Sequence, residues 1–276
     1  MTNVLIACSL APRAKATITA SIRIADGWKA KKSFCHIGDD TPDTRSRLQL
    51  LLADCGIYQP TLVIRPGIPE KVINQIALDL KVDLIIAGAL SHEPSLIGIW
   101  GSVSRRLVRQ AACSVLLLTD IKNDFQAFQH IVLRLNCYKE AKAIAVESIE
   151  LAVLMGATLH LVHEVDYALR LLSCEETTDS HRRHAYEKEC LLLEQEKLRD
   201  FIEGLDLKGL KPAYICLAAK DQFELKTYIT RKSIDLIITP SPKQWQFWER
   251  FFNMTVESVL QDMPCSILFY RDSACR

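Results

Sequence analysis

The chain repeats itself, and this internal repeat constrains the fold more than any other feature of the sequence. Four short segments recur at fixed offsets. Asp83–Ile86 recurs at Asp235–Ile238 and Cys113–Leu116 at Cys265–Leu268, both 152 residues later, while Val4–Ile6 matches Ile131–Leu133 and Cys35–Ile37 matches Val162–Glu164, both 127 residues later. The difference between the offsets places 25 additional residues after the second strand of the second repeat, within positions 166–199, where we expect a longer helix. Two similar units in tandem are therefore predicted.

Strand-like and helix-like segments alternate within each repeat. In the first repeat the apolar, strand-like segments are residues 3–8, 33–37, 61–64, 83–87 and 114–118, and the helix-like segments are residues 11–30, 42–54, 69–80 and 102–110. Largely apolar strands that alternate with helices are typical of a parallel sheet covered by helices on both faces. We predict an α/β fold of two tandem units, each with a five-stranded parallel sheet, at residues 1–122 and 128–274.

The composition narrows the class of protein. The 276 residues include 34 Lys and Arg against 33 Asp and Glu, and the net charge of +1 argues against a surface for nucleic acid. No apolar run reaches the roughly 18–20 residues that cross a bilayer, so no membrane segment is expected and a cytoplasmic location is predicted. The ten cysteines form no CxxC pair and lie mostly in apolar segments, so we expect reduced, buried thiols.

A phosphate-binding loop is predicted after the fourth strand. Gly88 and Ser91 are followed, after nine residues, by the sequence GSVS at 101–104, which opens a helix. Glycine lets backbone N–H groups approach an anion, serine hydroxyls donate further hydrogen bonds, and the start of a helix carries unpaired N–H groups. In a sheet of this class a ligand binds at the carboxyl ends of the strands.

These motifs resemble those of the universal stress protein family, in which Gly, two residues, Gly, nine residues and Gly-Ser/Thr occur at this place. The segments 67–69 (GIP), 101–118 and 159–166 (LHLVHEVD) extend the resemblance over both repeats. It implies an adenine-nucleotide α-hydrolase-like fold, with the two units packed as a pseudo-dimer through residues 114–118 and 266–270. It also implies ATP or AMP with Mg²⁺ in the first repeat. The implied binding residues are Gly88, Gly101, Ser102, Val103 and Ser104 for the phosphates and the backbone of Ile37 for adenine.

The two repeats depart from the family pattern to different degrees. In the first, Ser91 stands in place of the second glycine, and Ser9 stands where the family has an acidic residue, which weakens a ribose or metal contact. Both serines are counted with the six residues above, which gives eight candidate nucleotide-binding residues. In the second, Pro240 replaces the first glycine and Asn253 the glycine before the helix, so the loop is lost. We therefore expect a nucleotide in the first repeat only.

Aromatic residues take the place of the loop in the second repeat. Trp245, Trp248 and Phe252 follow the helical spacing i, i+3, i+7. One interpretation is a short helix that covers an empty pocket. The other is a surface for an unknown protein partner, because Trp and Phe concentrate binding energy at interfaces. Association into a homodimer is also left open.

Three functions follow as alternatives. The first is a stress-linked regulatory protein that binds ATP or AMP in its first repeat. The second is a nucleotide-free adaptor that uses residues 245–252. The third, an ATP hydrolase or nucleotidyl-transfer enzyme, is disfavoured because Ser9 and Asn136 supply no acidic metal ligand.

Histidines and arginines outside the loop are given no firm role. His36 and His163 occupy equivalent positions but lack a nearby nucleophile with an orienting carboxylate, so no catalytic residue is assigned. A zinc site is the weaker alternative to solvated surface histidines; its ligands would be His181, His184 and Cys174. The arginines that follow the loop either neutralise phosphates or face solvent; they are Arg105, Arg106 and Arg109.

Overall fold

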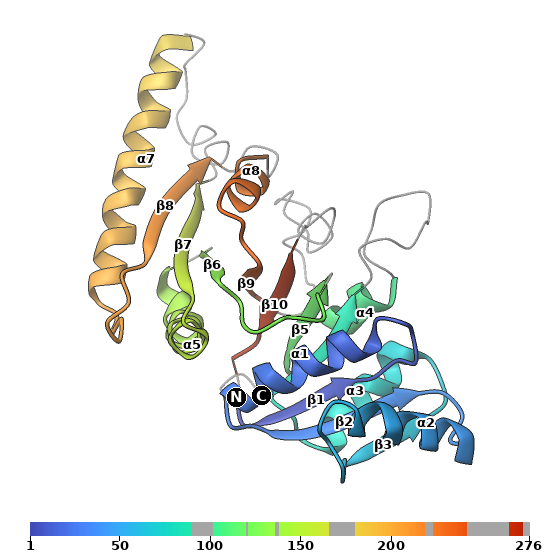
Figure 1. Cartoon of the computed structure of the whole chain (residues 1–276). Helices are drawn as coiled ribbons and strands as arrows, with labels where there is room; N and C mark the ends of the chain where they lie inside the picture. The colour runs from blue at the N-terminus through green and yellow to red at the C-terminus, as the bar shows by residue number, and fades with distance from the viewer. Residues whose placement is uncertain are drawn as a thin grey trace. The chain divides into compact units, whose positions relative to one another are not determined.

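The computed structural model describes residues 1–89, 102–119, 121–135, 138–165, 180–218, 223–241 and 265–272. The chain divides into two compact units, one made of Met1–Phe128 with Pro240–Arg276 and the other of Gln129–Thr239. Both alternate strands and helices, as predicted (Figure 1). None of the helices that are described is long and apolar enough to span a bilayer.

The first unit is built around a sheet with the strand order β3-β2-β1-β4-β5-β10. Its strands are β1 (Asn3–Ala7), β2 (Lys31–Ile37), β3 (Leu62–Arg65), β4 (Leu84–Ala89), β5 (Ser114–Thr119) and β10 (Ser266–Tyr270), and its helices are α1 (Ala14–Gly27), α2 (Pro42–Ala53), α3 (Pro69–Asp79) and α4 (Ser102–Gln110). The first five strands are parallel, which confirms the predicted fold class. The chain order reverses between β1 and β4, and a sheet of this kind binds ligands at the carboxyl ends of such strands.

Helix α1 is shorter than the predicted helix at residues 11–30. It begins at Ala14, whose N–H donates to the Ala11 carbonyl at 2.9 Å in a preceding turn. It ends at Gly27, and Lys29, with φ of 53°, adopts the left-handed conformation that often follows a helix. Arg13 therefore lies at the start of the helix, at the carboxyl end of the sheet, and not within a longer helix.

The second unit has a parallel sheet with the strand order β9-β6-β7-β8. Its strands are β6 (His130–Leu135), β7 (Thr158–Val165), β8 (Ala213–Ala218) and β9 (Leu236–Pro240), and its helices are α5 (Tyr138–Met155), α7 (Ser180–Glu203) and α8 (Phe223–Arg231). Helix α7, the long helix beside β8 in Figure 1, has 24 residues against 12 in α2. It lies where the additional residues of the second repeat were expected.

The repeated aspartate has the same structural role in both units. Asp83, just before β4, accepts hydrogen bonds from the backbone N–H groups of Thr2 at 2.9 Å and Asn3 at 3.0 Å. Asp235, just before β9, accepts equivalent bonds at 2.7 and 3.1 Å from the N–H groups at the start of β6. Each carboxylate holds the first strand of its unit beside the fourth, which explains why the DLII segment recurs.

The repeated serines before β5 and β10 also have matching roles. The Ser114 hydroxyl accepts a hydrogen bond from the N–H of Arg271 at 3.0 Å, and the Ser266 hydroxyl accepts one from the N–H of Thr119 at 3.2 Å. Each serine thus holds the far end of the neighbouring antiparallel strand.

The antiparallel pairing of β5 with β10 confirms that residues 114–118 and 266–270 lie side by side. Through this pairing β10 belongs to the first compact unit, whereas the predicted range 128–274 counts it with the second repeat. The boundaries of the sequence repeats therefore stay a prediction, distinct from the division into compact units.

Candidate functional site

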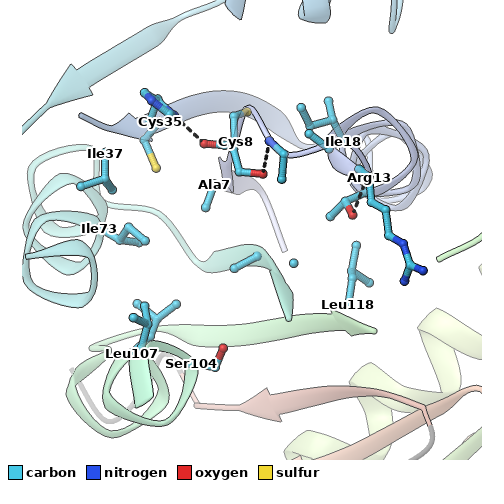
Figure 2. A pocket seen from close by; sticks show the side chains of 18 of the residues that line it. Ala7, Cys8, Arg13, Ile18, Cys35, Ile37, Ile73, Ser104, Leu107 and Leu118 are labelled. Atoms are coloured by element: carbon cyan, nitrogen blue, oxygen red, sulfur yellow. Dashed lines mark hydrogen bonds between the residues drawn. The ribbon is translucent and has the colours of Figure 1, made fainter. Parts of the chain in front are cut away.

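A pocket of about 350 Å³ opens at the carboxyl ends of β1, β2, β4 and β5 in the first unit (Figure 2). Its lining comes from the ends of these strands, the start of α1, one face of α4 and one residue of α3. Five of the eight residues predicted to bind a nucleotide line it together: Ser9, Ile37, Gly88, Val103 and Ser104. Ser102 opens α4, whereas Ser91 and Gly101 lie outside the described residues.

The pocket has an apolar wall. Ile37 at the end of β2, Ile73 on α3 and Leu107 on α4 lie along one side of the pocket in Figure 2. Leu118 of β5 lies on the other side, and Ala7 of β1 lies between the two sides. A concave apolar surface of this kind suits a flat ring system, because the ring buries its faces against aliphatic side chains.

Glycine allows a close approach at the end of β4. A Cβ atom at Gly88 would lie 3.2 Å from the Cγ2 atom of Thr17 on α1, tighter than most real contacts. Opposite it, Val103 and Ser104 line the pocket from the first turn of α4, which contains no acidic residue, and Figure 2 shows the Ser104 oxygen directed toward the pocket. The start of α4 therefore contributes a hydroxyl and the partial positive charge of a helix N-terminus.

The start of α1 supplies a cation to the same pocket. Arg13 is the residue before the first turn of α1, its side chain makes no capping hydrogen bond, and the first turn contains no acidic residue. Figure 2 shows its side chain extending along the edge of the pocket on the side of Leu118. Ser9 is nearby, and its hydroxyl accepts a hydrogen bond from the N–H of Ala11 at 3.4 Å. The polar groups on this side of the pocket are thus neutral or positively charged.

A histidine joins the first two strands in each unit. Nδ1 of His36 lies 2.9 Å from the carbonyl oxygen of Cys8, so Nδ1 donates the hydrogen bond. His163 donates the equivalent bond to the carbonyl oxygen of Leu135 at 3.1 Å. The shared bond gives the two histidines the same structural role.

Two thiols line the pocket without being reactive. Burial raises the pKa of the Cys35 thiol to about 12 and also raises the pKa of the Cys8 thiol, to which the neighbouring thiols of Cys35 and Cys55 contribute. Both groups are protonated at neutral pH, and a protonated thiol is a poor nucleophile. The seven cysteines among the described residues are free, as expected for reduced thiols.

One arginine of α4 links two helices. Nε of Arg106 lies 3.1 Å from Oε1 of Glu70, a buried carboxylate in the first turn of α3, so Arg106 joins α3 to α4. Arg13 was missed by the sequence analysis because the predicted helix began too early and placed it inside a helix. Pro12 was the signal that could have found it, since proline is common where a helix begins.

A buried ion pair occupies the equivalent place in the second unit. Arg134 and Glu164 follow Ala7 and Ile37 by 127 residues, and the register of β6 with β7 matches that of β1 with β2. Nε of Arg134 pairs with Oε2 of Glu164, and both side chains are only 4% exposed. Where the first unit has part of an apolar wall, the second therefore has two charged side chains paired with each other.

A second buried carboxylate, Glu194 of α7, lies against the same strand. Its Oε2 atom is 3.3 Å from Nε2 of His163, and its Oε1 atom accepts a hydrogen bond from Nζ of Lys197 at 2.9 Å. The stripe predicted on this helix consists of Leu191, which is half-buried, and of Leu198 and Ile202, which are buried. The stripe is thus not purely apolar, because Glu194 is buried with two basic partners.

Several predicted features lie outside the described residues. They are Asn136, Cys174, Asn253 and the aromatic residues Trp245, Trp248 and Phe252. His181 and His184 belong to α7, but the description does not extend to their side chains. The zinc site and the aromatic surface therefore stay predictions.

Comparisons with known proteins bear on the fold and the family. Residues 39–119 match the universal stress protein family. No curated protein sequence matches the chain. A protein of unknown function from Pseudomonas aeruginosa PAO1 is similar in structure, with 13% identity, a TM-score of 0.71 and coverage of 99% of this chain and 94% of that one. A universal stress protein from Archaeoglobus fulgidus DSM 4304 has 13% identity, a TM-score of 0.63 and coverage of 99% and 97%. At this identity the likeness shows the fold.

Proposed function

We propose that the chain is a regulatory protein whose first unit binds an adenine nucleotide, because residues 39–119 match the universal stress protein family and the chain is similar in structure to a universal stress protein over nearly its whole length. The observation that carries the proposal is the pocket at the carboxyl ends of β1, β2, β4 and β5. Five of the eight candidate nucleotide-binding residues line this pocket together.

The pocket suits the two chemically different parts of a nucleotide. The apolar wall of Ile37, Ile73 and Leu107 would bury the faces of adenine. The start of α4, with Ser104, and the cation of Arg13 would meet the phosphate end, because helix N-termini and guanidinium groups both favour anions. The volume of about 350 Å³ is at the lower end of the roughly 300–1,000 Å³ range of small-molecule pockets.

Restriction of the nucleotide to the first unit is part of the proposal. The second unit has Arg134 and Glu164 in place of Ala7 and Ile37, and a nucleobase there would have to displace a buried ion pair. Separating such a pair is costly, because the buried Glu164 carboxylate would lose its guanidinium partner in a poorly hydrated place. Pro240 also lacks the N–H group that a phosphate loop would use at the end of β9.

The alternative functions have less support in the described residues. An adaptor function would use Trp245, Trp248 and Phe252, which lie outside them. A hydrolase would need groups that hold a metal ion, and the described residues that line the pocket include no carboxylate. A homodimer and a cytoplasmic location stay predictions.

A matched pair of variants tests nucleotide binding. Val103, 37% exposed on α4, lines the pocket, whereas Val146, 39% exposed on α5, belongs to the second unit. We expect AMP or ATP to bind the wild-type chain in calorimetric titration, and Val103→Trp to weaken binding by about tenfold or more because the indole would fill the pocket. Val146→Trp should bind as the wild type does. Absence of binding heat in the wild type, together with no nucleotide released on denaturation, would refute the proposal.

A further inference from the structure

Two carboxylates near the carboxyl ends of the strands in the first unit, Asp40 and Glu70, are already paired. Asp40, which follows β2, accepts hydrogen bonds from Nε and Nη2 of Arg45 at 3.1 and 2.6 Å. Glu70, in the first turn of α3, is buried and pairs with Arg106 at 3.1 Å. Neither residue lines the pocket.

Magnesium, which the family resemblance implies, does not fit this donor set. Proteins that bind nucleotides with Mg²⁺ hold the ion through one or two carboxylates in addition to the phosphates. The pocket residues that are described offer hydroxyls, thiols, an imidazole and a guanidinium, but no carboxylate, and Ser9 stands at the end of the first strand. No cluster of three acidic, histidine or cysteine ligands occurs in the described part of the chain.

The pocket carries positive charge, which can attract a phosphate group without a metal ion. Arg13 presents a guanidinium, which can donate two parallel hydrogen bonds to a phosphate group. The starts of α1 and α4 carry no acidic side chain in their first turns and add partial positive charge. A single phosphate carries a charge of about −1.5 to −2, which this set can largely offset, whereas a triphosphate without Mg²⁺ would leave more charge uncompensated.

We propose, on the basis of the function proposed above, that the first unit binds an adenine nucleotide with one phosphate group independently of divalent cations, and that Arg13 binds this phosphate. AMP is the simplest ligand of this class. Arg13 is then a specificity-determining residue, because it distinguishes AMP from adenosine, while the apolar wall contributes equally to both.

The test is calorimetric titration of the full chain with AMP, ATP and adenosine, each in EDTA and in Mg²⁺ at matched ionic strength. We expect the Kd for AMP to be the same within about twofold in both buffers, and ATP to bind no more tightly than AMP. Arg13→Gln should weaken AMP binding by about tenfold or more, since hydrogen bonds to charged groups are among the stronger ones, and leave adenosine binding unchanged. Arg47→Gln is the matched control, because Arg47 is an exposed arginine that pairs with Asp43 on α2.

The outcomes separate this inference from the proposed function. Loss of AMP binding in EDTA, or tighter binding of Mg²⁺–ATP than of AMP, would overturn metal independence and leave nucleotide binding intact. An equal loss of AMP and adenosine binding in Arg13→Gln would overturn the phosphate contact, because it would show a structural role for Arg13. Absence of binding of any of the three ligands would refute the proposed function itself and this inference with it.

Discussion

Replacing one member of the buried ion pair in the second unit should destabilise that unit strongly. Arg134 and Glu164 are each 4% exposed, so Arg134→Met would leave the Glu164 carboxylate buried without its guanidinium partner. Breaking a buried pair in this way typically costs about 3–5 kcal/mol. We expect Arg134→Met, and likewise Glu164→Leu, to lower the free energy of unfolding of the second unit by an amount in this range.

The double variant Arg134→Met/Glu164→Leu should behave differently from the sum of the single ones. It removes both charges and keeps approximately the side-chain volume, and such replacements are often neutral or stabilising. We expect its unfolding free energy to lie within about 1–2 kcal/mol of the wild type, which corresponds to a large favourable coupling between the two single changes.

The measurement is urea-induced unfolding of the full chain together with hydrogen exchange of the β6 and β7 amides, which reports on the second unit alone. Lys208→Met is a suitable control, because Lys208 pairs with Glu150 at 2.7 Å but both side chains are more than 40% exposed, and it should change stability little. If each single variant cost less than about 1 kcal/mol, or if the double variant cost the sum of the single ones, the reasoning about the buried pair would be wrong.

Three further predictions concern other parts of the chain. Burial, with nearby positive charges, lowers the pKa of His160 below the ordinary 6.5, so the unfolded chain binds the proton more readily than the folded one. The free energy of unfolding should therefore fall as the pH drops through about 6.5. His160→Gln should remove this dependence in urea titrations at pH 7.5 and 5.5. Ser114→Ala should lower the free energy of unfolding by about 1–3 kcal/mol and speed hydrogen exchange in β10. The reason is that the Ser114 hydroxyl accepts a hydrogen bond from the Arg271 N–H at 3.0 Å and donates one to the Arg271 carbonyl at 3.3 Å. Unchanged exchange would contradict this role. Burial raises the pKa values of the Cys8 and Cys35 thiols, so both should react slowly with iodoacetamide at pH 8 in the folded protein and rapidly in urea. Mass spectrometry can follow the reaction. Equal rates in the folded and the urea-unfolded protein would show that these thiols are accessible in the folded one.

The strands of the first repeat were predictable from sequence because each contains a short apolar segment between turn signals. The predicted strands of the first repeat agree with β1 to β5 to within two residues at each end. The repeated DLII segment also has a local physical cause, the capping of the neighbouring strand by Asp83 or Asp235. The early start predicted for α1 shows where this approach fails. Ala11 and Ala14 are equally good helix formers, so helix propensity does not distinguish them, and the later start is marked by Pro12 and by the hydrogen bonds of the turn.

The candidate site was partly predictable. Gly88, Val103 and Ser104 were found because a phosphate loop needs flexible backbone and a helix start at fixed spacing, and that spacing can be read from the sequence. Arg13 was not found, because its place in the pocket depends on where α1 begins. Glu194 was not found either, since a helical pattern records it as a polar position and its partner His163 lies on a strand 31 positions earlier.

The contrast between the two units depends on buried positions as much as on the loop. The loop sequence alone predicted that the second repeat binds no nucleotide, because Pro240 and Asn253 replace two glycines. Loss of a loop would weaken the hold on a phosphate and leave the apolar wall for a base in place. The exchange of Ala7 and Ile37 for Arg134 and Glu164 removes part of that wall, since it places a paired guanidinium and carboxylate where a ring would bury its face. Because both changes act on different parts of the same ligand, restoring the glycines alone should not give the second unit a nucleotide site.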